Sequence, residues 1–377
     1  MDYFSDYSSN TCAASGNQSI FSASSQETGI GRVFYKLTHS GSYRYRLCFS
    51  GILDSTFADG SVSRCNLPCP EWKLRRCRVA VFPGNILDKN FSDPAEAQRI
   101  NQNLSGFQDL SFSCGAEATI HGQELLFSDP IPLTADAGDY LCVESEFQGT
   151  ILPYHEESLL PVFRFGGGSW RYDKRVPLPC SVSCDRPVKA KIGFWGDSIT
   201  QGIGTVPNSY RHWCALAAQQ LPSEVACWNL GLGYGRASDA ASGGIWMRKA
   251  LQNDIVCVCF GVNDILQGSS CEKLKQDLFS IVTTLKSAGK TVLLQTVPPF
   301  DYAKEILPIW HEVNRYIREE LSGIVDIVLD TVPFLGLSEQ TPHIAKFGGH
   351  PNEEGCVVWV QAILPKLLDA LRQGGYL

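Results

Sequence analysis

The pattern of apolar and polar positions changes character near residue 185. From about residue 30 to 165 the apolar runs are short and β-prone, and turn residues interrupt them, as in "GRVFYKLTH", "LSFSCG" and "DYLCVESEF". Many short strands with frequent turns indicate a β-sandwich of jelly-roll-like type. We therefore predict an N-terminal β-sandwich domain that, with its linker, covers residues 1–185. Residues 1–30, rich in Ser, Asn and Gln, are expected to be a loose arm or irregular lead-in.

The second half of the chain alternates strand-like and helix-like segments. "DIVCVCFGV" is almost wholly apolar, which is typical of a parallel strand buried on both faces. Apolar residues recur at helical spacing in "CEKLKQDLFSIVTTLKSAGK", and a final helix is expected in "NEEGCVVWVQAILPKLLDALRQ". The five expected strands lie at 189–195, 224–232, 254–262, 291–297 and 324–330. The pattern predicts a doubly wound α/β domain over residues 186–377, with ligands at the carboxyl ends of its strands.

Polar residues and glycines follow four of these strands. They are Ser198 after the first strand, Gly231 and Gly233 after the second, Asn263 and Asp264 after the third, and His350 after the fifth. Since the carboxyl ends of parallel strands meet at one edge of a sheet, we expect these residues to converge. Taken singly, each has an ordinary structural explanation, such as a helix cap, a turn glycine or an Asx turn.

Together these residue types suit acyl transfer. A serine hydroxyl needs a neighbouring base to become a nucleophile, and a histidine with a pKa near 6.5 serves at neutral pH. The oxyanion of the tetrahedral intermediate needs hydrogen-bond donors. The candidates are the N–H of Ser198, the N–H of Gly231 or Gly233, and the amide of Asn263. Ester hydrolysis needs only water, and no cluster of residues has metal-ligand spacing, so neither a metal nor an organic cofactor is predicted.

Composition narrows the function classes. The chain has 377 residues, 44% hydrophobic, and a formal net charge of −7 without a basic stripe, which argues against nucleic acid as a partner. No apolar run approaches the ~18–20 residues of a membrane span. The N-terminus lacks the basic and apolar regions of a signal peptide, so a cytoplasmic location is expected. The sequence does not indicate an oligomeric state.

Fifteen cysteines is a high count. Several lie in apolar runs, where a reduced thiol packs as a small hydrophobe. Cys65 and Cys69, and likewise Cys180 and Cys184, form C-x3-C pairs, but no second pair follows at zinc-ribbon spacing. Reduced packing thiols are therefore expected, with a few disulfides or a structural zinc site as the alternatives.

Four short blocks resemble those of the SGNH, or GDSL, hydrolases. They are "GDSIT" at 196–200, a glycine after the second strand, "GVND" at 261–264 and "HPN" at 350–352. The resemblance implies a serine esterase with a flavodoxin-like three-layer α/β/α fold. It implies that Ser198 is the nucleophile, His350 the general base and Asn263 an oxyanion donor. Gly231 best matches the glycine donor, and Gly233 is the other placement.

One position departs from the family pattern. The family usually has an aspartate three residues before the histidine, and this chain has Phe347 there. One reading is a Ser-His dyad with a backbone carbonyl holding the ring. A second is that Asp330, at the end of the fifth strand, takes the aspartate's place, and a third is an inactive relative. His343 competes with His350 as the base but lacks the "HPN" context.

A β-sandwich before an SGNH domain resembles the two-domain carbohydrate acetylesterases of the carbohydrate esterase family 2 type, some of which also work without the aspartate. This resemblance implies removal of O-acetyl groups from plant-type oligosaccharides. Trp195, Trp228 and Trp246 are candidates for an aromatic floor beneath a sugar. The predicted function is thus an acetylesterase acting on acetylated oligosaccharides or other small esters through an acyl-Ser198 intermediate. A lipase or thioesterase, and a non-catalytic carbohydrate-binding relative, are the alternatives.

Overall fold

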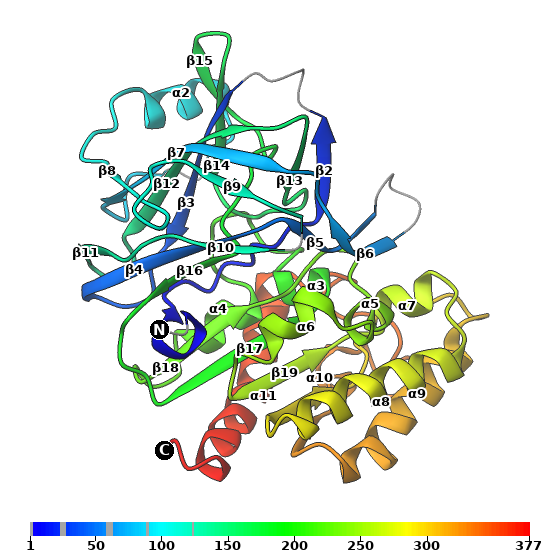
Figure 1. Ribbon diagram of the computed structural model, residues 1–377. Helices are drawn as coiled ribbons and strands as arrows, with labels where there is room; N and C mark the ends of the chain where they lie inside the picture. Colours follow the sequence, from blue (N-terminus) through cyan, green and yellow to red (C-terminus); the bar gives the residue numbers. More distant parts are fainter. Residues whose placement is uncertain (1–2, 23–27, 58–62, 88–89, 123) are drawn as a thin grey trace. The chain divides into compact units, whose positions relative to one another are not determined.

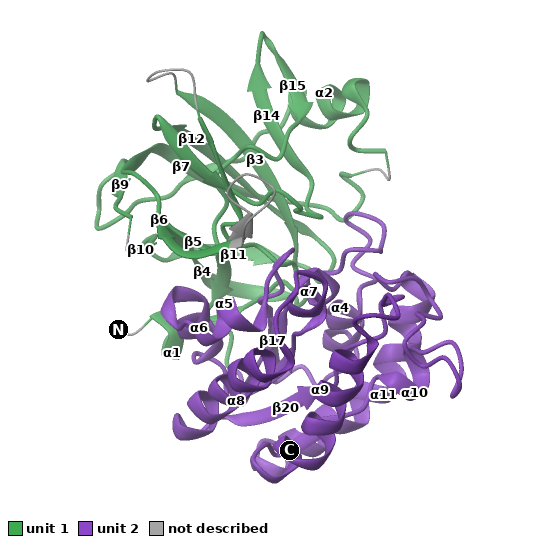
Figure 2. Cartoon of the chain, turned by 90° about the vertical axis from the view of Figure 1, so that its right-hand side faces the viewer, with its two compact units in different colours: residues 1–187 green, residues 188–377 purple. Residues whose placement is uncertain are grey.

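The computed structural model describes residues 3–22, 28–57, 63–87, 90–122 and 124–377. The chain divides into two compact units (Figure 2). Unit 1 is residues 1–187 and unit 2 is residues 188–377. The boundary expected from the sequence fell after residue 185.

Unit 1 is built mainly from antiparallel strands (Figure 1). Within the described residues, the larger sheet runs β15 (Ser169–Tyr172), β14 (Val162–Gly166), β3 (Gly29–Lys36), β12 (Tyr140–Gln148), β7 (Trp72–Phe82) and β8 (Gln108–Asp109), and β9 (Ala118–Ile120) also pairs with β7. The second sheet runs β1 (Ser8–Ser9), β16 (Ser181–Cys184), β4 (Gly41–Ser50) and β10 (Leu125–Phe127), and β11 (Ile131–Ala135) also pairs with β4. Two small sheets pair β13 (Ile151–Tyr154) with β2 (Ser19–Ser22) and β5 (Ile52–Phe57) with β6 (Ser63–Pro68).

Two short helices complete the described part of unit 1, α1 (Tyr3–Asp6) and α2 (Pro94–Gln102). The side chain of Asp93 caps α2 by accepting the N–H groups of Ala95 and Glu96, and Pro94 occupies the first turn, where no N–H is needed. The apolar face of α2 packs on side chains of β3, β12 and β14. In the same region Arg32 on β3 donates to Glu144 on β12 at 2.7 Å, so this buried charge is paired.

The structure corrects two expectations for unit 1. Of the two alternatives for the N-terminal segment, the loose arm is wrong over residues 3–22, because buried asparagines tie this largely irregular lead-in to the sheets. Asn10 donates to Tyr45 Oη at 2.8 Å, and Asn17 donates to the carbonyl of Ser50 at 2.6 Å. The segment "LSFSCG" is a tight turn rather than a strand, closed by a bridge between Phe112 and Gly115.

Unit 2 contains a parallel five-stranded sheet. The strands run in the order β18 (Val225–Asn229), β17 (Ala190–Gly196), β19 (Ile255–Cys259), β20 (Thr291–Gln295) and β21 (Ile327–Leu329), and every neighbouring pair is parallel. In chain order this is 2-1-3-4-5, the flavodoxin-like arrangement. The structure therefore confirms the five predicted strands and the doubly wound α/β fold of this half.

Helices cover both faces of this sheet (Figure 1). They are α3 (Ser198–Gln201), α4 (Trp213–Ala218), α5 (Ala237–Ala241), α6 (Gly244–Ala250), α7 (Val262–Leu266), α8 (Cys271–Ser287), α9 (Leu307–Glu319), α10 (Val332–Leu335) and α11 (Glu353–Gln373), with a 3-10 turn at Leu321–Gly323. α4 packs against α11, whereas α8 packs against α5 and α9. Right-handed crossovers in this strand order place these two groups on opposite faces, which gives three layers.

The tryptophans of unit 2 belong to its core. Trp195 and Trp246 are buried, and their rings contact each other and Phe260 edge to face. Trp213 on α4 stacks on Trp359 of α11 with ring centroids 5.0 Å apart. The proposed aromatic floor for a sugar is therefore wrong for Trp195 and Trp246, which the sheet and helices need for packing.

The fifteen cysteines all lie in the described part of the chain and are free thiols there. Among the described residues, no cluster of three or more His, Cys, Asp or Glu side chains is arranged to hold a metal ion. None of the helices in the described ranges is both long and apolar enough to span a membrane.

Candidate active site

Ser198 lies at the carboxyl end of β17, the strand at which the chain order of the sheet reverses. β17 ends at Gly196, and the side chain of Asp197 then caps α3 by accepting the N–H of Ile199 at 2.9 Å. This cap makes Ser198 the first residue of a short helix directly after the strand. Such a sharp strand-to-helix turn holds the serine at the sheet edge where ligands bind in this class of fold.

His350 lies beside this serine. Its Nε2 atom is 2.8 Å from Ser198 Oγ, although the two residues are 152 positions apart. Asn352 starts α11 just after the histidine, and its side chain accepts the N–H of Gly355 at 2.9 Å. The hydroxyl and the imidazole are therefore within hydrogen-bonding distance, as general-base activation requires.

The backbone around His350 is held closely from one side by the loop after α3. Gly204 has a φ of 102°, and a Cβ at this position would come within 2.6 Å of the carbonyl oxygen of His350. Both features require glycine there. Burial lowers the pKa of His350 below its usual value. A lower pKa favours the neutral imidazole, which is the form that can accept the serine proton.

The glycine-rich loop after β18 connects α3 with the next strand end. A Cβ on Gly231 would lie 2.1 Å from the backbone nitrogen of Gln201, so only glycine fits against α3. The N–H of Gly233 donates to Gln201 Oε1 at 2.6 Å, and Asn263 Nδ2 donates to the carbonyl of Gly235 at 3.0 Å. The loop therefore ties the helix of Ser198 to Asn263.

Not every predicted oxyanion donor is available in this arrangement. The N–H of Gly231 donates to the side chain of Asn229 at 2.9 Å, so it is engaged within the protein, as is the N–H of Gly233. The amide of Asn263 has two protons, and its bond to Gly235 uses one of them. That bond fixes the amide orientation and leaves the second proton for a ligand.

Comparison of the sequence with models of protein families gives a match that includes the residues of this site. Residues 194–357 match the model of the GDSL-like Lipase/Acylhydrolase family. The match spans Ser198, Asn263 and His350 and covers less than half of the chain. Unit 2 is a GDSL/SGNH hydrolase domain. No curated protein matches the sequence.

Solved structures resemble the hydrolase domain at low identity. A member of the lipolytic protein G-D-S-L family from Veillonella parvula is 22% identical, with a TM-score of 0.38, over 46% of this chain and 96% of its own. Axe2, an acetylxylan esterase from Geobacillus stearothermophilus, is 19% identical, with a TM-score of 0.40, over 48% of this chain and 95% of its own. The acetyl xylan esterase AlAXEase is 18% identical, with a TM-score of 0.39, over 47% of this chain and 99% of its own.

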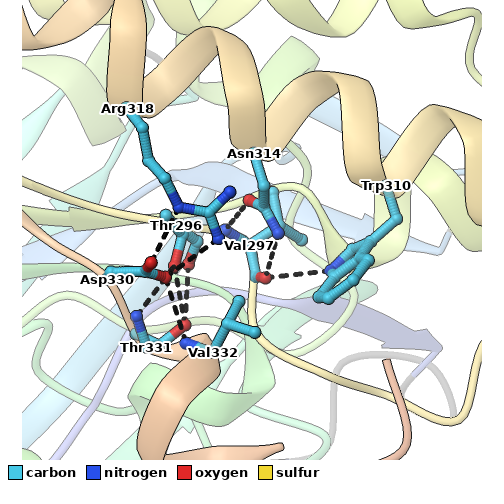
Figure 3. Close-up of polar contacts among 8 residues, drawn as sticks. All are labelled: Thr296, Val297, Trp310, Asn314, Arg318, Asp330, Thr331 and Val332. Carbon is cyan, nitrogen blue, oxygen red and sulfur yellow. Dashed lines mark hydrogen bonds and ion pairs between the residues drawn. The ribbon is translucent and has the colours of Figure 1, made fainter. Parts of the chain in front are cut away.

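In the described part of the hydrolase domain, the carboxylate of Asp330 is bound by groups other than His350. Figure 3 shows its carboxylate engaged by other groups. Arg318 Nε donates to it at 2.7 Å, Thr296 Oγ1 at 3.1 Å and the N–H of Val332 at 3.2 Å. No hydrogen bond or ion pair joins Asp330 to His350 in the described residues. The carboxylate stabilises the end of β21 and the start of α10 instead.

His350 likewise has no hydrogen bond or ion pair with His343 or Asp264 in the described residues. Phe347 packs against Gly355 at the start of α11, and the Nδ1 atom of His343 is buried without a hydrogen-bond partner. Asp264 accepts the N–H groups of Ala237 and Ser238 at the start of α5, and burial raises its pKa to about 6. Within the described ranges, the ring of His350 hydrogen-bonds to Ser198 alone, so the suggested backbone carbonyl is not found.

Sequence reasoning missed two contributors to the site of the hydrolase domain. Gln201 holds the glycine-rich loop against α3, and the ring of Phe300 contacts the ring of His350. Gln201 follows the "GDSIT" block directly, so its place on the helix of Ser198 was a usable signal. Phe300 carries no such signal, because an aromatic residue after a buried strand is usual in any core.

Proposed function

We propose that this protein is a serine esterase that removes O-acetyl groups from carbohydrates through an acyl-Ser198 intermediate, with Ser198 and His350 acting as a dyad. One observation carries the proposal, the 2.8 Å contact between Ser198 Oγ and His350 Nε2 at the carboxyl end of the parallel sheet. A neutral imidazole at this distance is the partner that a weakly acidic hydroxyl needs to attack an ester.

The first half of the proposed reaction forms the acyl-enzyme. Ser198 Oγ attacks the ester carbonyl carbon while its proton moves to His350 Nε2. The negative charge then resides on the former carbonyl oxygen, where the N–H of Ser198 and the amide of Asn263 are the proposed donors. The bond between the acyl carbon and the sugar oxygen breaks, and the imidazolium returns its proton to that oxygen.

The second half restores the enzyme. A water molecule gives a proton to His350 as its oxygen attacks the acyl carbon, and His350 passes that proton to Ser198 Oγ as the acyl–oxygen bond breaks. Acetic acid leaves and ionises to acetate by giving a proton to the solvent. In this account Gly231 is a packing residue, because its N–H bonds to Asn229. In the proposed dyad, the imidazolium that forms during the reaction has no carboxylate partner.

The carbohydrate part of the proposal rests on domain organisation. The two larger antiparallel sheets of unit 1 support the predicted jelly-roll-like β-sandwich, and a β-sandwich before an SGNH domain resembles the two-domain carbohydrate acetylesterases. The expected cytoplasmic location suits an enzyme that trims imported oligosaccharides, and fractionation of cells expressing the protein tests that location.

An acetate-release assay tests the function. The purified full chain should release acetate from 4-nitrophenyl acetate and from acetylated xylo- and manno-oligosaccharides, and Ser198→Ala should abolish both activities. Ser280→Ala, a change on the surface helix α8, is the matched control and should keep them. Unchanged hydrolysis by Ser198→Ala would end the proposal. Faster hydrolysis of esters with eight or more acyl carbons would point to a lipase or thioesterase instead.

A further inference from the structure

The histidine of the proposed dyad has an aromatic neighbour and, in the described residues, no carboxylate partner. Phe300 follows β20, and the centroid of its ring lies 5.1 Å from that of His350 with the planes at 82°. This is the edge-to-face arrangement that aromatic rings prefer. A Cβ on Gly349 would lie 3.1 Å from the Phe300 ring, so the chain beside the histidine leaves just enough room for it.

The loop that carries Phe300 is clamped to α9. Asn314 bonds both backbone groups of Val297, accepting its N–H at 2.7 Å and donating to its carbonyl at 3.0 Å. The indole N–H of Trp310 donates to the same carbonyl at 3.0 Å, as Figure 3 shows. Tyr302 contacts Trp310 and donates to the carbonyl of Pro298 at 3.1 Å. The loop that carries Phe300 is therefore held in place by several hydrogen bonds.

The same loop is also tied to the segment that leads to His350. Asp301 accepts the N–H of Ala345 at 2.7 Å, and its own N–H donates to the carbonyl of His343 at 3.2 Å. Asp301 has a φ of 55°, a backbone conformation that costs energy in a residue other than glycine. The two hydrogen bonds tie the residue next to Phe300 to the segment that precedes His350.

We propose that Phe300 is the positioning residue for His350, and that its ring holds the imidazole in the orientation that faces Ser198. This inference rests on the proposed function for its catalytic meaning. A hydrophobic wall and an aspartate both restrict rotation of the ring, but they act oppositely on its charge. The aspartate favours the imidazolium, whereas the wall excludes water and favours the neutral base. Burial does lower the pKa of His350.

The test compares three variants of the full chain. Phe300→Ala should lower kcat by about 100-fold with little change in KM, because a small displacement of a catalytic group has that cost. Phe300→Tyr keeps the ring and should restore most of the activity. Phe279→Ala, which removes an exposed phenylalanine of α8, is the matched control and should change nothing.

A second readout does not depend on substrate. NMR titration of the His350 imidazole should show its pKa rising toward the ordinary value in Phe300→Ala, because water reaches the ring, and staying near the wild-type value in Phe300→Tyr. If wild-type protein hydrolyses no ester, the proposed function fails, and this titration still tests the contact. A folded Phe300→Ala variant with an unchanged titration overturns the inference. So does a Phe300→Tyr variant that is as impaired as Phe300→Ala.

Discussion

Two strand ends of the hydrolase domain hold their ionisable side chains in opposite ways. At the end of β21, three donors surround the carboxylate of Asp330, and one of them is the guanidinium of Arg318. At the sheet edge after β17, the imidazole of His350 has one hydroxyl partner and an aromatic neighbour. The first arrangement fixes a charge for structural purposes. The second favours the neutral form of the imidazole and directs its Nε2 atom at one hydroxyl.

The comparison shows why position in the sequence did not identify the histidine's partner. Asp330 follows a parallel strand and so belongs to the correct edge of the sheet. The carboxylate of Asp330 already accepts hydrogen bonds from a guanidinium, a hydroxyl and a backbone N–H. Turning toward an imidazole would break these bonds. What distinguishes the two strand ends is therefore how many donors each group already has.

The largest effect should come from removing the base. His350→Ala should lower turnover by roughly four to six orders of magnitude, because a serine without its base loses nearly all of its nucleophilic catalysis. Steady-state kinetics with 4-nitrophenyl acetate measure this. His343→Ala provides the matched comparison in the same segment and should remain active. The reverse result would move the base to His343.

The next effect tests the oxyanion donors. Asn263→Ala should lower kcat by ~100–1000-fold with little change in KM, since the amide acts mainly in the transition state. Gly231→Ala should behave differently, because its Cβ would clash with α3 and destabilise the fold. Thermal unfolding separates the two cases. A stable Gly231→Ala protein with a selective loss of kcat would return Gly231 to the oxyanion site.

The pH dependence sharpens the comparison further. The dyad requires neutral His350, and burial lowers the pKa of His350. The value of kcat/KM should therefore rise with pH through a midpoint below 6.5, the ordinary histidine value, and be level at neutral pH. A midpoint clearly above 6.5 would indicate a carboxylate partner and contradict the dyad.

The smallest effect should come from the other strand end. Asp330→Asn removes the ion pair with Arg318, whose side chains are 34% and 37% exposed, so the loss of stability should be no more than about 1 kcal/mol. Turnover should stay within about threefold of the wild-type value. The midpoint of the pH profile should not differ measurably from that of wild type. A loss of turnover comparable to that of Asn263→Ala would restore Asp330 as the orienting residue.

The sequence predicted the regular parts of unit 2 well. Parallel strands buried on both faces form continuous apolar runs, so β19 and β20 were visible as "DIVCVCFGV" and "TVLLQTV". Irregular structure leaves no such periodicity. The N-terminal segment is ordered by the side chains of Asn10 and Asn17, whose partners lie far away in the sequence. In the turn at Ser113 and Cys114 both residues have positive φ values, which neither serine nor cysteine predicts from the sequence.

The site was predictable to the extent that its chemistry lies in short blocks. Ser198 and His350 each stand in such a block, and the fold brings them together. The donors that bind the carboxylate of Asp330 come from α9 and from the neighbouring strand end, so their effect appears only in three dimensions. The same holds for Phe300, because it acts through ring contact rather than through a reactive group.

Covalent labelling of the nucleophile tests the central claim most directly. A fluorophosphonate probe should react with wild-type protein and with Asp330→Asn, and peptide mass spectrometry should place the adduct on Ser198. The label should be absent from Ser198→Ala and strongly reduced in folded His350→Ala. An adduct on another residue, or equal labelling of His350→Ala, would contradict a catalytic pair formed by this hydroxyl and this imidazole.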